Sequence, residues 1–497
     1  MTVPSSERAA AQDETNRLLV INTGLLTITE LLTKVLSLVL IILVARTLGP
    51  VQMGIYAFAL TFIQLFEIVV NFGIERYIQR EVGRQAGLAG VLFSQIFSLK
   101  VGLYLLVWAA ILAAGALLID NPLKRHVVWL LSLTLFFRTN LATTTAFFRA
   151  TQQARYEAVV VISLRLMYSV AGMAAVWAGY GLLVLVSLEM LATATACGVA
   201  WWLFWPRGSR WQWWAWGELV GLARAAKDFF IIRVVLVVFN ATDMLMLSWL
   251  GGDVATGFYA VALRLTAALD FFPEAFGGAF LPVLSRRAQE GWPAFTAIFQ
   301  QYYRYLLIVG IGLAVGLSGL AQEGITLLFG AAFSPAIATL RWLALALLLD
   351  YVNRCLSNAL IAVDEEKALL RIFGLAAGGK IVLSVLLIPG YQQNGAAVAT
   401  VLAEVVVLVL LLSAVGWRRL QPLGLVHLTV RPAAAGFLTG GVIWGLTWWA
   451  LPLAVLLPLA ALAMLGSLML TRALSWQEVL AGLHLLQAGG RPRVPAA

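Results

Sequence analysis

The sequence predicts an all-α polytopic membrane protein with about 14 transmembrane helices. We expect two six-helix lobes, related by a pseudo-twofold repeat along the membrane normal, followed by two C-terminal helices. Composition, the spacing of apolar runs and an internal repeat predict this fold. The chain has 497 residues, of which 61% are hydrophobic and only 12% are charged. Because soluble domains carry about 25% charged residues, a water-soluble protein is excluded.

Apolar runs long enough to cross a bilayer, about 20 residues each, recur along the whole chain. The 14 candidate spans are residues 22–46, 53–74, 91–118, 127–148, 157–178, 181–205, 228–250, 255–283, 302–320, 334–362, 368–388, 394–416, 430–451 and 453–472. Residues 321–333 fit either a loop or a continuation of the ninth span, and the pattern leaves both open.

Lysine and arginine residues concentrate in alternate loops between these spans. One set of loops holds clusters such as Arg80 with Arg84, whereas the opposite set holds Arg46, Lys124 and Arg125 and little else. By the positive-inside rule the first set is cytoplasmic, and an even number of spans places both termini in the cytoplasm. The net charge of +10 follows from this topology, so we predict no nucleic-acid partner.

Two amphipathic segments are predicted outside the spans. The loop 206–227 contains WQWWAWGELV, and tryptophans at this density fit the headgroup region, so we expect a helix on the inner leaflet. The stretch SWQE after Arg472 reads as a capping box that opens a second surface helix. The predicted organisation is a cytoplasmic tail (1–21), an N-lobe (22–205), the tryptophan-rich linker (206–227), a C-lobe (228–416), the last two spans (430–472) and a cytoplasmic amphipathic tail (473–497).

Two pairs of segments repeat in the same order along the chain. LGPVQMGIYAFAL (48–60) matches LGGDVATGFYAVAL (250–263), and WLLSLTLFFRTN (129–140) matches WLALALLLDYVN (342–353). In the first pair, a tight glycine-containing turn joins one span to the next. Each copy has an even number of spans, so the two copies share one orientation, as in transporters that place their substrate between parallel repeats.

The stretches NTGLL…LVARTLGPVQMGIYAFAL and DMLMLSWLGGDVATGFYAVALRL…FLPVLSRR resemble the polysaccharide transporter family. These are the Wzx-type oligosaccharide/O-antigen flippases of the multidrug/oligosaccharidyl-lipid/polysaccharide exporter superfamily. The resemblance covers nearly the whole chain and implies two lobes in a V shape that work by alternating access. It further implies movement of an undecaprenyl-diphosphate-linked oligosaccharide, the repeat unit of a polysaccharide, O-antigen or exopolysaccharide, from the inner to the outer leaflet.

The resemblance also implies a location and partners. We expect a multi-pass protein of the bacterial inner (plasma) membrane whose partners are the polyprenyl-diphosphate-linked oligosaccharide and membrane lipids. A polysaccharide polymerase and glycosyltransferases are further candidate partners. We expect a monomer without a cofactor, driven by an ion gradient or by the membrane potential.

Charged residues lie inside the predicted spans, where each costs at least about 2.5–3.5 kcal/mol on insertion scales. In the first span, Thr27, Glu30 and Lys34 fall on one helical face, which must face protein or a wet cavity. We interpret the basic residues as a cationic cavity for a diphosphate headgroup, because Arg binds phosphate oxygens through two donors. The candidates are Lys34, Lys100, Arg138, Arg233, Arg264, Arg341 and Lys380.

The intramembrane acids are candidates for ion coupling, because a carboxylate in a low-dielectric cavity can exchange protons near neutrality. The leading ones are Glu30, Glu67, Asp243 and Asp270, and Glu67 and Asp270 occupy equivalent positions in the two copies. The alternative for each charge is a structural pair within or between helices, such as Glu30 with Lys34 at i,i+4. Sequence alone leaves both interpretations open.

Three other functions are compatible with parts of this pattern. A multidrug or cation antiporter shares the lobe plan, but a cavity rich in Lys and Arg would repel cations. A lipid II flippase has the same chemistry and stays open. A membrane enzyme is not expected, because no phosphate-binding loop, zinc-ligand spacing or nucleophile elbow occurs. The two cysteines, Cys197 and Cys355, lie in separate apolar spans, so neither a disulfide nor a metal site is predicted.

Overall fold

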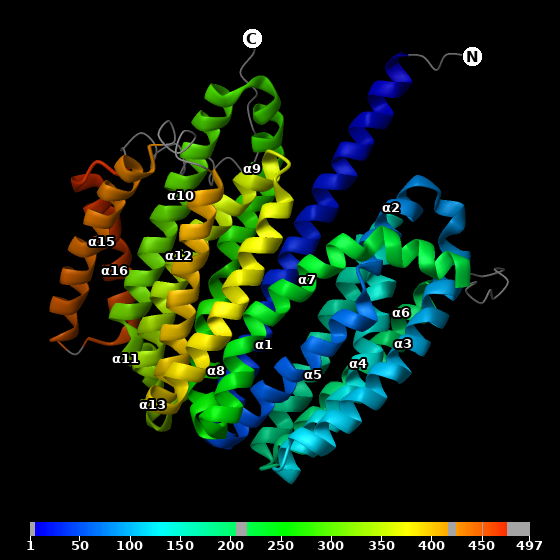
Figure 1. Cartoon of the computed structure of the whole chain (residues 1–497), viewed down its shortest axis with the longest axis horizontal. Coiled ribbons are helices and arrows are strands. Elements are labelled where there is room, and N and C mark those ends of the chain that lie inside the picture. The colour runs from blue at the N-terminus through cyan, green and yellow to red at the C-terminus, as the bar shows by residue number, and fades with distance from the viewer. Residues whose placement is uncertain (1–4, 205–215, 416–423, 450, 475–497) are drawn as a thin grey trace. The chain divides into compact units, whose positions relative to one another are not determined.

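Helices make up the regular structure of the described chain. The computed structural model describes residues 5–204, 216–415, 424–449 and 451–474, and Figure 1 shows its helices. The first half contains α1 (Ser5–Asn71), α2 (Ile74–Arg84), η1 (Ala86–Leu88), α3 (Ala89–Leu118), α4 (Pro122–Ala150), α5 (Ala154–Trp177), α6 (Leu182–Phe204) and α7 (Trp216–Leu250). The second half contains α8 (Gly252–Ala267), η2 (Ala268–Asp270), α9 (Phe271–Glu290), α10 (Trp292–Gly319), α11 (Ala321–Phe329), η3 (Ala331–Phe333), α12 (Ala336–Ala362), α13 (Glu366–Val415), α15 (Leu425–Thr447) and α16 (Leu453–Leu470).

The predicted all-α membrane fold is confirmed. Eleven helices in the described ranges are long and apolar enough to cross a bilayer. Two of these segments contain a break with non-helical backbone angles, at Gly49 in α1 and at Gln392 in α13, so each supplies two spans. The 23-residue helix α15 coincides with the thirteenth predicted span but is not among these eleven apolar segments. Every one of the 14 predicted spans therefore falls on a helix.

Three segments between or beyond the spans refine the prediction. Residues 321–333, which fitted either a loop or a longer ninth span, form the separate short helix α11 and the turn η3. Residues 216–227 of the predicted linker continue without a break into α7. Residues 205–215 of that linker and residues 475–497 of the predicted tail lie outside the described residues.

The short helix α2 was not predicted, because its apolar pattern covers too few residues to resemble a span. Its apolar face consists of Ile74, Ile78 and Val82, which recur at helical spacing. These side chains are buried against Phe93 of α3 and Phe147 of α4. Burial of this face holds the connection between the second and third spans against the helix bundle.

The chain divides into two compact units, Met1–Ala260 and Val261–Ala497. In the first, α6 packs against α4 and α5, and α1 packs against α5 and α7. In the second, α12 packs against α10 and α13, and α15 packs against α10 and α16. The predicted lobe boundaries, 22–205 and 228–416, stay a prediction.

Two turns of the same backbone shape join the first span to the second and the seventh to the eighth. Gly49 has a φ of 76° and Gly252, its equivalent in the second copy, has a φ of 83°. Glycine adopts this left-handed conformation without the steric cost that a Cβ atom would impose. The glycine in each tight turn of the repeat is therefore required by backbone geometry.

The helices that follow these turns cross in direct backbone contact. A Cβ atom added to Gly54 would overlap the carbonyl oxygen of Asp253, and one added to Gly257 would overlap the carbonyl oxygen of Pro50. The repeat aligns Gly54 with Gly257 and Pro50 with Asp253. The contact is therefore reciprocal, as in a two-fold interface where residue i meets j and j meets i.

We expect Gly54→Ala and Gly257→Ala each to destabilise the protein. Overpacking costs about 1–3 kcal/mol in typical cores, and here the added carbon meets a backbone carbonyl that cannot rotate away. The midpoint of thermal unfolding of the purified protein in detergent should fall for both variants.

Gly102→Ala in α3 and Gly198→Ala in α6 are the matched controls. A Cβ atom at either position meets nothing within 4 Å, and Ala is a better helix former than Gly. These two variants should keep or raise the unfolding midpoint. Four equal midpoints would contradict the proposed role of the glycine crossing.

Candidate functional site

A fully buried lysine lies inside the first unit. Lys100 of α3 is 0% exposed. Its ammonium group donates to Asn71 Oδ1 at 2.8 Å and to the main-chain oxygen of Thr139 at 2.9 Å. A buried ammonium needs such acceptors to offset its lost hydration. The structure thus places this predicted substrate-contacting residue among protein partners from α1 and α4.

An ion pair lies beside this lysine. Arg138 Nη2 of α4 is 2.6 Å from Glu67 Oε2 of α1, and their side chains are 32% and 22% exposed. Asn71, one turn after Glu67, also donates to the Glu67 carboxylate at 3.5 Å. Two residues predicted for different roles, one cationic and one acidic, are therefore brought together.

An equivalent ion pair lies in the second unit. Arg354 of α12 donates from Nε to Asp350 Oδ2 at 2.7 Å, and its Nη2 lies 3.6 Å from Asp270 Oδ1. In both units, an acid at the second span of the repeat faces an arginine of the fourth span. Sequence reasoning selected Asp270 but not Arg354, although the i,i+4 spacing of Asp350 and Arg354 carried a signal of pairing.

A second polar cluster in this unit involves the two halves of α13. Glu404 is 7% exposed and accepts a hydrogen bond of 2.8 Å from Asn353 Nδ2 of α12, which is 2% exposed. The predicted cation Lys380 is 2% exposed and lies within electrostatic reach of Glu404. Glu404 was not selected from the sequence, although a lone acid within VLAEVVVLVL is the same signal that selected the others.

The remaining predicted residues lie in different surroundings. Lys34 is half-buried on α1, and Asp243 is buried on α7. The side chain of Glu30 lies outside the described residues. Arg233 on α7 is exposed and Arg264 on α8 is partly exposed, and neither forms a hydrogen bond or ion pair with the side chains that the structure describes. Their guanidinium donors are thus available to an anion.

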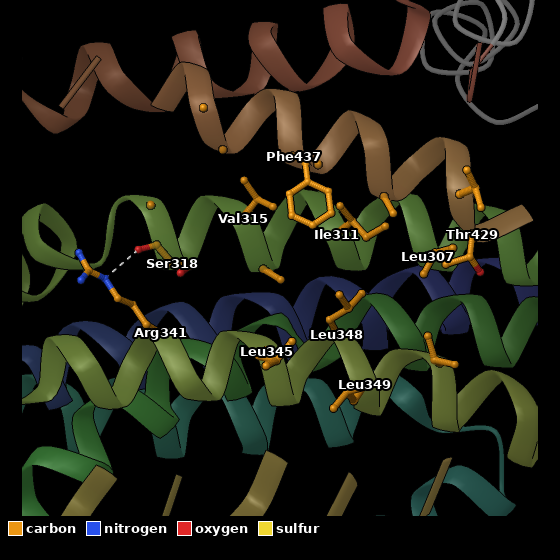
Figure 2. Close-up of a pocket in the computed structure, with 18 of the residues that line it drawn as sticks. Leu307, Ile311, Val315, Ser318, Arg341, Leu345, Leu348, Leu349, Thr429 and Phe437 are labelled. Atoms are coloured by element: carbon orange, nitrogen blue, oxygen red, sulfur yellow. Dashed lines mark hydrogen bonds between the residues drawn. The ribbon is translucent and has the colours of Figure 1, made fainter. Parts of the chain in front are cut away.

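The second unit contains a large apolar cavity, which we call the α15 cavity. Its volume is about 1170 Å³, it is partly open, and α10, α11, α12, α13 and α15 line it. Figure 2 shows Phe437 of α15 near Ile311 and Val315 of α10, with Leu345 and Leu348 of α12 beyond them. The volume exceeds the roughly 300–1,000 Å³ of most small-molecule sites.

The α15 cavity follows the whole length of its main helix. Lining residues run from Leu425 to Thr447, the first and last residues of α15. A helix of 23 residues is about 34 Å long, close to the ~30 Å thickness of the hydrocarbon core. Figure 2 shows Arg341 and Thr429 at opposite ends of the cavity, with Arg341 Nε donating to the main-chain oxygen of Ser318 at 3.3 Å.

The cavity is apolar along most of its length and polar at its ends. Such a surface suits a hydrocarbon chain, because burying apolar area gains free energy in proportion to the area removed from water. Only Arg341 among the predicted cationic residues lines it. The sequence did not predict this cavity, since it is assembled from five helices that are far apart in the chain.

Comparisons with known proteins found one matching family model and several solved structures of similar fold. The family model described as "Polysaccharide biosynthesis protein" matches residues 19–287. No curated protein sequence matches the chain significantly. Among solved structures, a lipid II flippase MurJ in an inward closed conformation is similar, with a TM-score of 0.72 and 14% identity over 89% of this chain and 97% of that one.

A second solved structure shares the fold. It is an inward-facing multidrug resistance MATE family transporter of the MOP superfamily, with a TM-score of 0.65 and 15% identity over 80% of this chain and 96% of that one. At such low sequence identity, the structural similarity shows a common fold and nothing more specific. The two-copy helical architecture expected from the resemblance is therefore confirmed.

A double-mutant cycle separates a structural role of the Glu67–Arg138 pair from one in binding. We expect Glu67→Gln and Arg138→Gln each to lower the free energy of unfolding, because each leaves a charge without its partner. The double variant should recover part of the loss, with a coupling energy on the order of 1–3 kcal/mol. The measurement is SDS denaturation in mixed micelles.

The exposed pair Arg80–Glu81 of α2, 2.9 Å apart, provides the control cycle. Exposed pairs contribute at most about 1 kcal/mol, so its coupling energy should be smaller. Strictly additive losses in the Glu67 and Arg138 variants would show that the pair does not stabilise the unit.

Proposed function

This chain belongs to the polysaccharide biosynthesis protein family, and we propose that it is a flippase for a polyprenyl-diphosphate-linked oligosaccharide. It would carry the oligosaccharide from the inner to the outer leaflet of a bacterial plasma membrane by alternating access. In this proposal both termini are cytoplasmic, the protein acts as a monomer, and it catalyses no covalent step. The observation that carries the proposal is the α15 cavity.

The cavity supports a lipid-linked cargo through its length and lining. A hydrocarbon tail that follows α15 from Leu425 to Thr447 can remain in apolar surroundings across the thickness of the membrane. A water-soluble cargo needs no such path. By the predicted topology the Arg341 end faces the outer leaflet, and the Thr429 end faces the cytoplasm.

Two arginines that pair with no side chain in the described ranges support an anionic headgroup. Arg233 and Arg264 keep their donors available, and a guanidinium group binds phosphate oxygens in a planar, two-donor geometry. Lys100 and Arg138, in contrast, already contact protein acceptors. We therefore propose Arg233 and Arg264 as the leading contacts of the diphosphate, and Lys34, on the polar face of the first span, as a further candidate.

The carboxylates support coupling to an ion gradient or to the membrane potential. Glu67 and Asp270 each face an arginine in the structure, so uptake of a proton or cation by either acid would weaken its ion pair. Weakening these pairs would change the contact between the second and fourth spans of each repeat. This coupling is proposed for Asp243 as well, which is 5% exposed.

Two other cargoes remain as alternatives within the same superfamily. Lipid II combines the same tail and diphosphate with a different glycan, so the cavity fits it equally well. A cationic drug fits less well, since the positive charges of Arg233 and Arg264 would repel it. The lipid-linked intermediate that accumulates when the gene is deleted identifies the cargo, because cell-wall precursor would indicate lipid II and a polysaccharide repeat unit would support our proposal.

Filling the α15 cavity should block export. Gly441 lines the cavity, and a Cβ atom added there meets nothing within 4 Å, so the ring of Gly441→Phe can extend into the path of the tail. We expect surface polysaccharide to fall several-fold in a deletion strain that expresses this variant. The control is Gly445→Phe, one turn further along α15. An added Cβ atom meets nothing within 4 Å there, and Gly445 does not line the cavity.

Both variants should reach the membrane in wild-type amounts, as measured by immunoblot. The proposal predicts normal polysaccharide with Gly445→Phe only. Equal yields from the two variants would exclude the cavity from the export path.

Removing a headgroup contact should abolish export while sparing the fold. We expect Arg264→Ala and Lys34→Ala to eliminate surface polysaccharide, because the diphosphate loses a charged partner. Arg286→Ala is the control, since its side chain is 83% exposed and only 3.6 Å from Glu290 in a surface pair. Wild-type polymer yield in both test variants would sink the cationic-cavity hypothesis.

A further inference from the structure

A buried charged contact lies beside the crossing of the two turns. Lys124, near the start of α4, is 6% exposed, and its ammonium group lies 2.7 Å from a carboxylate oxygen of Asp253 on α8. The same ammonium donates to the hydroxyl of Ser248 on α7 and lies 4.1 Å from the ring centre of Phe58 on α1. All four residues belong to the unit Met1–Ala260.

The start of α4 is built to hold this lysine in place. Asn121 caps the helix by accepting a hydrogen bond of 3.0 Å from the main-chain nitrogen of Leu123. Pro122 occupies the first helical position, where no backbone donor is needed. The amide nitrogen of Asn121 donates to the second carboxylate oxygen of Asp253 at 3.3 Å. The Asn121 side chain thus caps α4 and also donates to the carboxylate that Lys124 contacts.

The contact joins the two copies of the repeat. Lys124 and Phe58 belong to the first copy, whereas Ser248 and Asp253 belong to the second. The positive-inside rule places this end of the spans on the outer side of the membrane. The charged contact and the adjacent glycine crossing therefore join the first copy to α7 and to the start of α8 at this end.

A charged contact can separate at a lower free-energy cost than an apolar contact of similar size. Buried ion pairs are often less stabilising than apolar groups of the same volume, because both ions lose their hydration. When the pair separates toward water, Lys124 and Asp253 regain that hydration. Opening an apolar contact would expose hydrophobic side chains to water, and no gain in hydration would offset that cost. The charged contact therefore keeps the free-energy difference between the closed and open states small.

We propose that Lys124, Asp253 and Ser248 form a polar latch that closes the outer end and separates each time the protein opens outward. The inference rests on the proposed function, since outward opening is the step in which an oligosaccharide would leave. A permanent structural pair would look the same in one structure. The two behave differently in solution, because only a latch exposes its buried groups.

Thiol labelling tests the latch without any substrate. Ser248 is 7% exposed, so a thiol in Ser248→Cys reacts with a membrane-impermeant maleimide only when the contact opens. We expect measurable labelling in right-side-out membrane vesicles, and several-fold faster labelling when Asp253→Asn is added. Wild-type protein sets the background, since Cys197 and Cys355 are 0% and 1% exposed. Labelling of both variants at the wild-type background would overturn the proposal.

Cross-linking tests whether opening is needed for export. In Asn121→Cys/Asp253→Cys, a short bifunctional thiosulfonate should link the two copies, stop polysaccharide export and be reversed by a reductant. The control is Arg149→Cys/Glu157→Cys, a pair 2.8 Å apart that joins α4 to α5 within one copy and should export when linked. Undiminished export by the first linked variant would overturn the latch.

The two measurements separate failure of the latch from failure of the proposed function. The labelling rates do not depend on what the protein carries. If deletion of the gene left surface polysaccharide unchanged, the proposed function would fail, and the thiol labelling would still decide whether the outer contact opens.

Discussion

Two helical turns in this protein can meet only because neither carries a Cβ atom at the point of contact. Gly54 lies against the carbonyl of Asp253, and Gly257 lies against the carbonyl of Pro50. The reciprocity of this contact follows from the repeat, since identical turns placed face to face require the same small residue on each side. The position of Lys124 opposite Asp253 depends on this approach, because a wider separation would leave the buried ammonium of Lys124 without its counter-ion.

Some charged residues inside the spans form ion pairs with other helices, whereas others keep donors that a ligand could use. Each unit neutralises an acid of the second span with an arginine of the fourth, which limits the cost of placing either in a membrane. Arg233 and Arg264 are not used in this way. The pattern explains why the chain can contain many intramembrane charges and still fold, while a few cations stay accessible for the proposed headgroup.

The sequence predicted the helical spans because apolar length is a local property that each segment carries by itself, whereas the orientation inferred from loop charge stays a prediction. Of the selected charges, Lys100, Lys380 and Asp243 are buried. The pairing partners were not predicted, since Glu67 and Arg138 lie on different helices and Arg354 was not selected. The α15 cavity could not be predicted from the sequence, because it depends on how side chains from five helices pack together and leave a space unfilled. Lys124 was interpreted only as an exception to the topology rule, although that exception marks the outer contact.

The partial opening of the α15 cavity has a consequence for selectivity. If the cavity holds a lipid tail as proposed, a tail longer than α15 can continue from the cavity into the surrounding bilayer. The cavity would then not measure how many isoprene units a carrier contains. Carriers of different chain length would therefore be equivalent to it. Discrimination among cargoes then falls to the diphosphate and the first sugars, the part of the molecule that must leave the lipid phase.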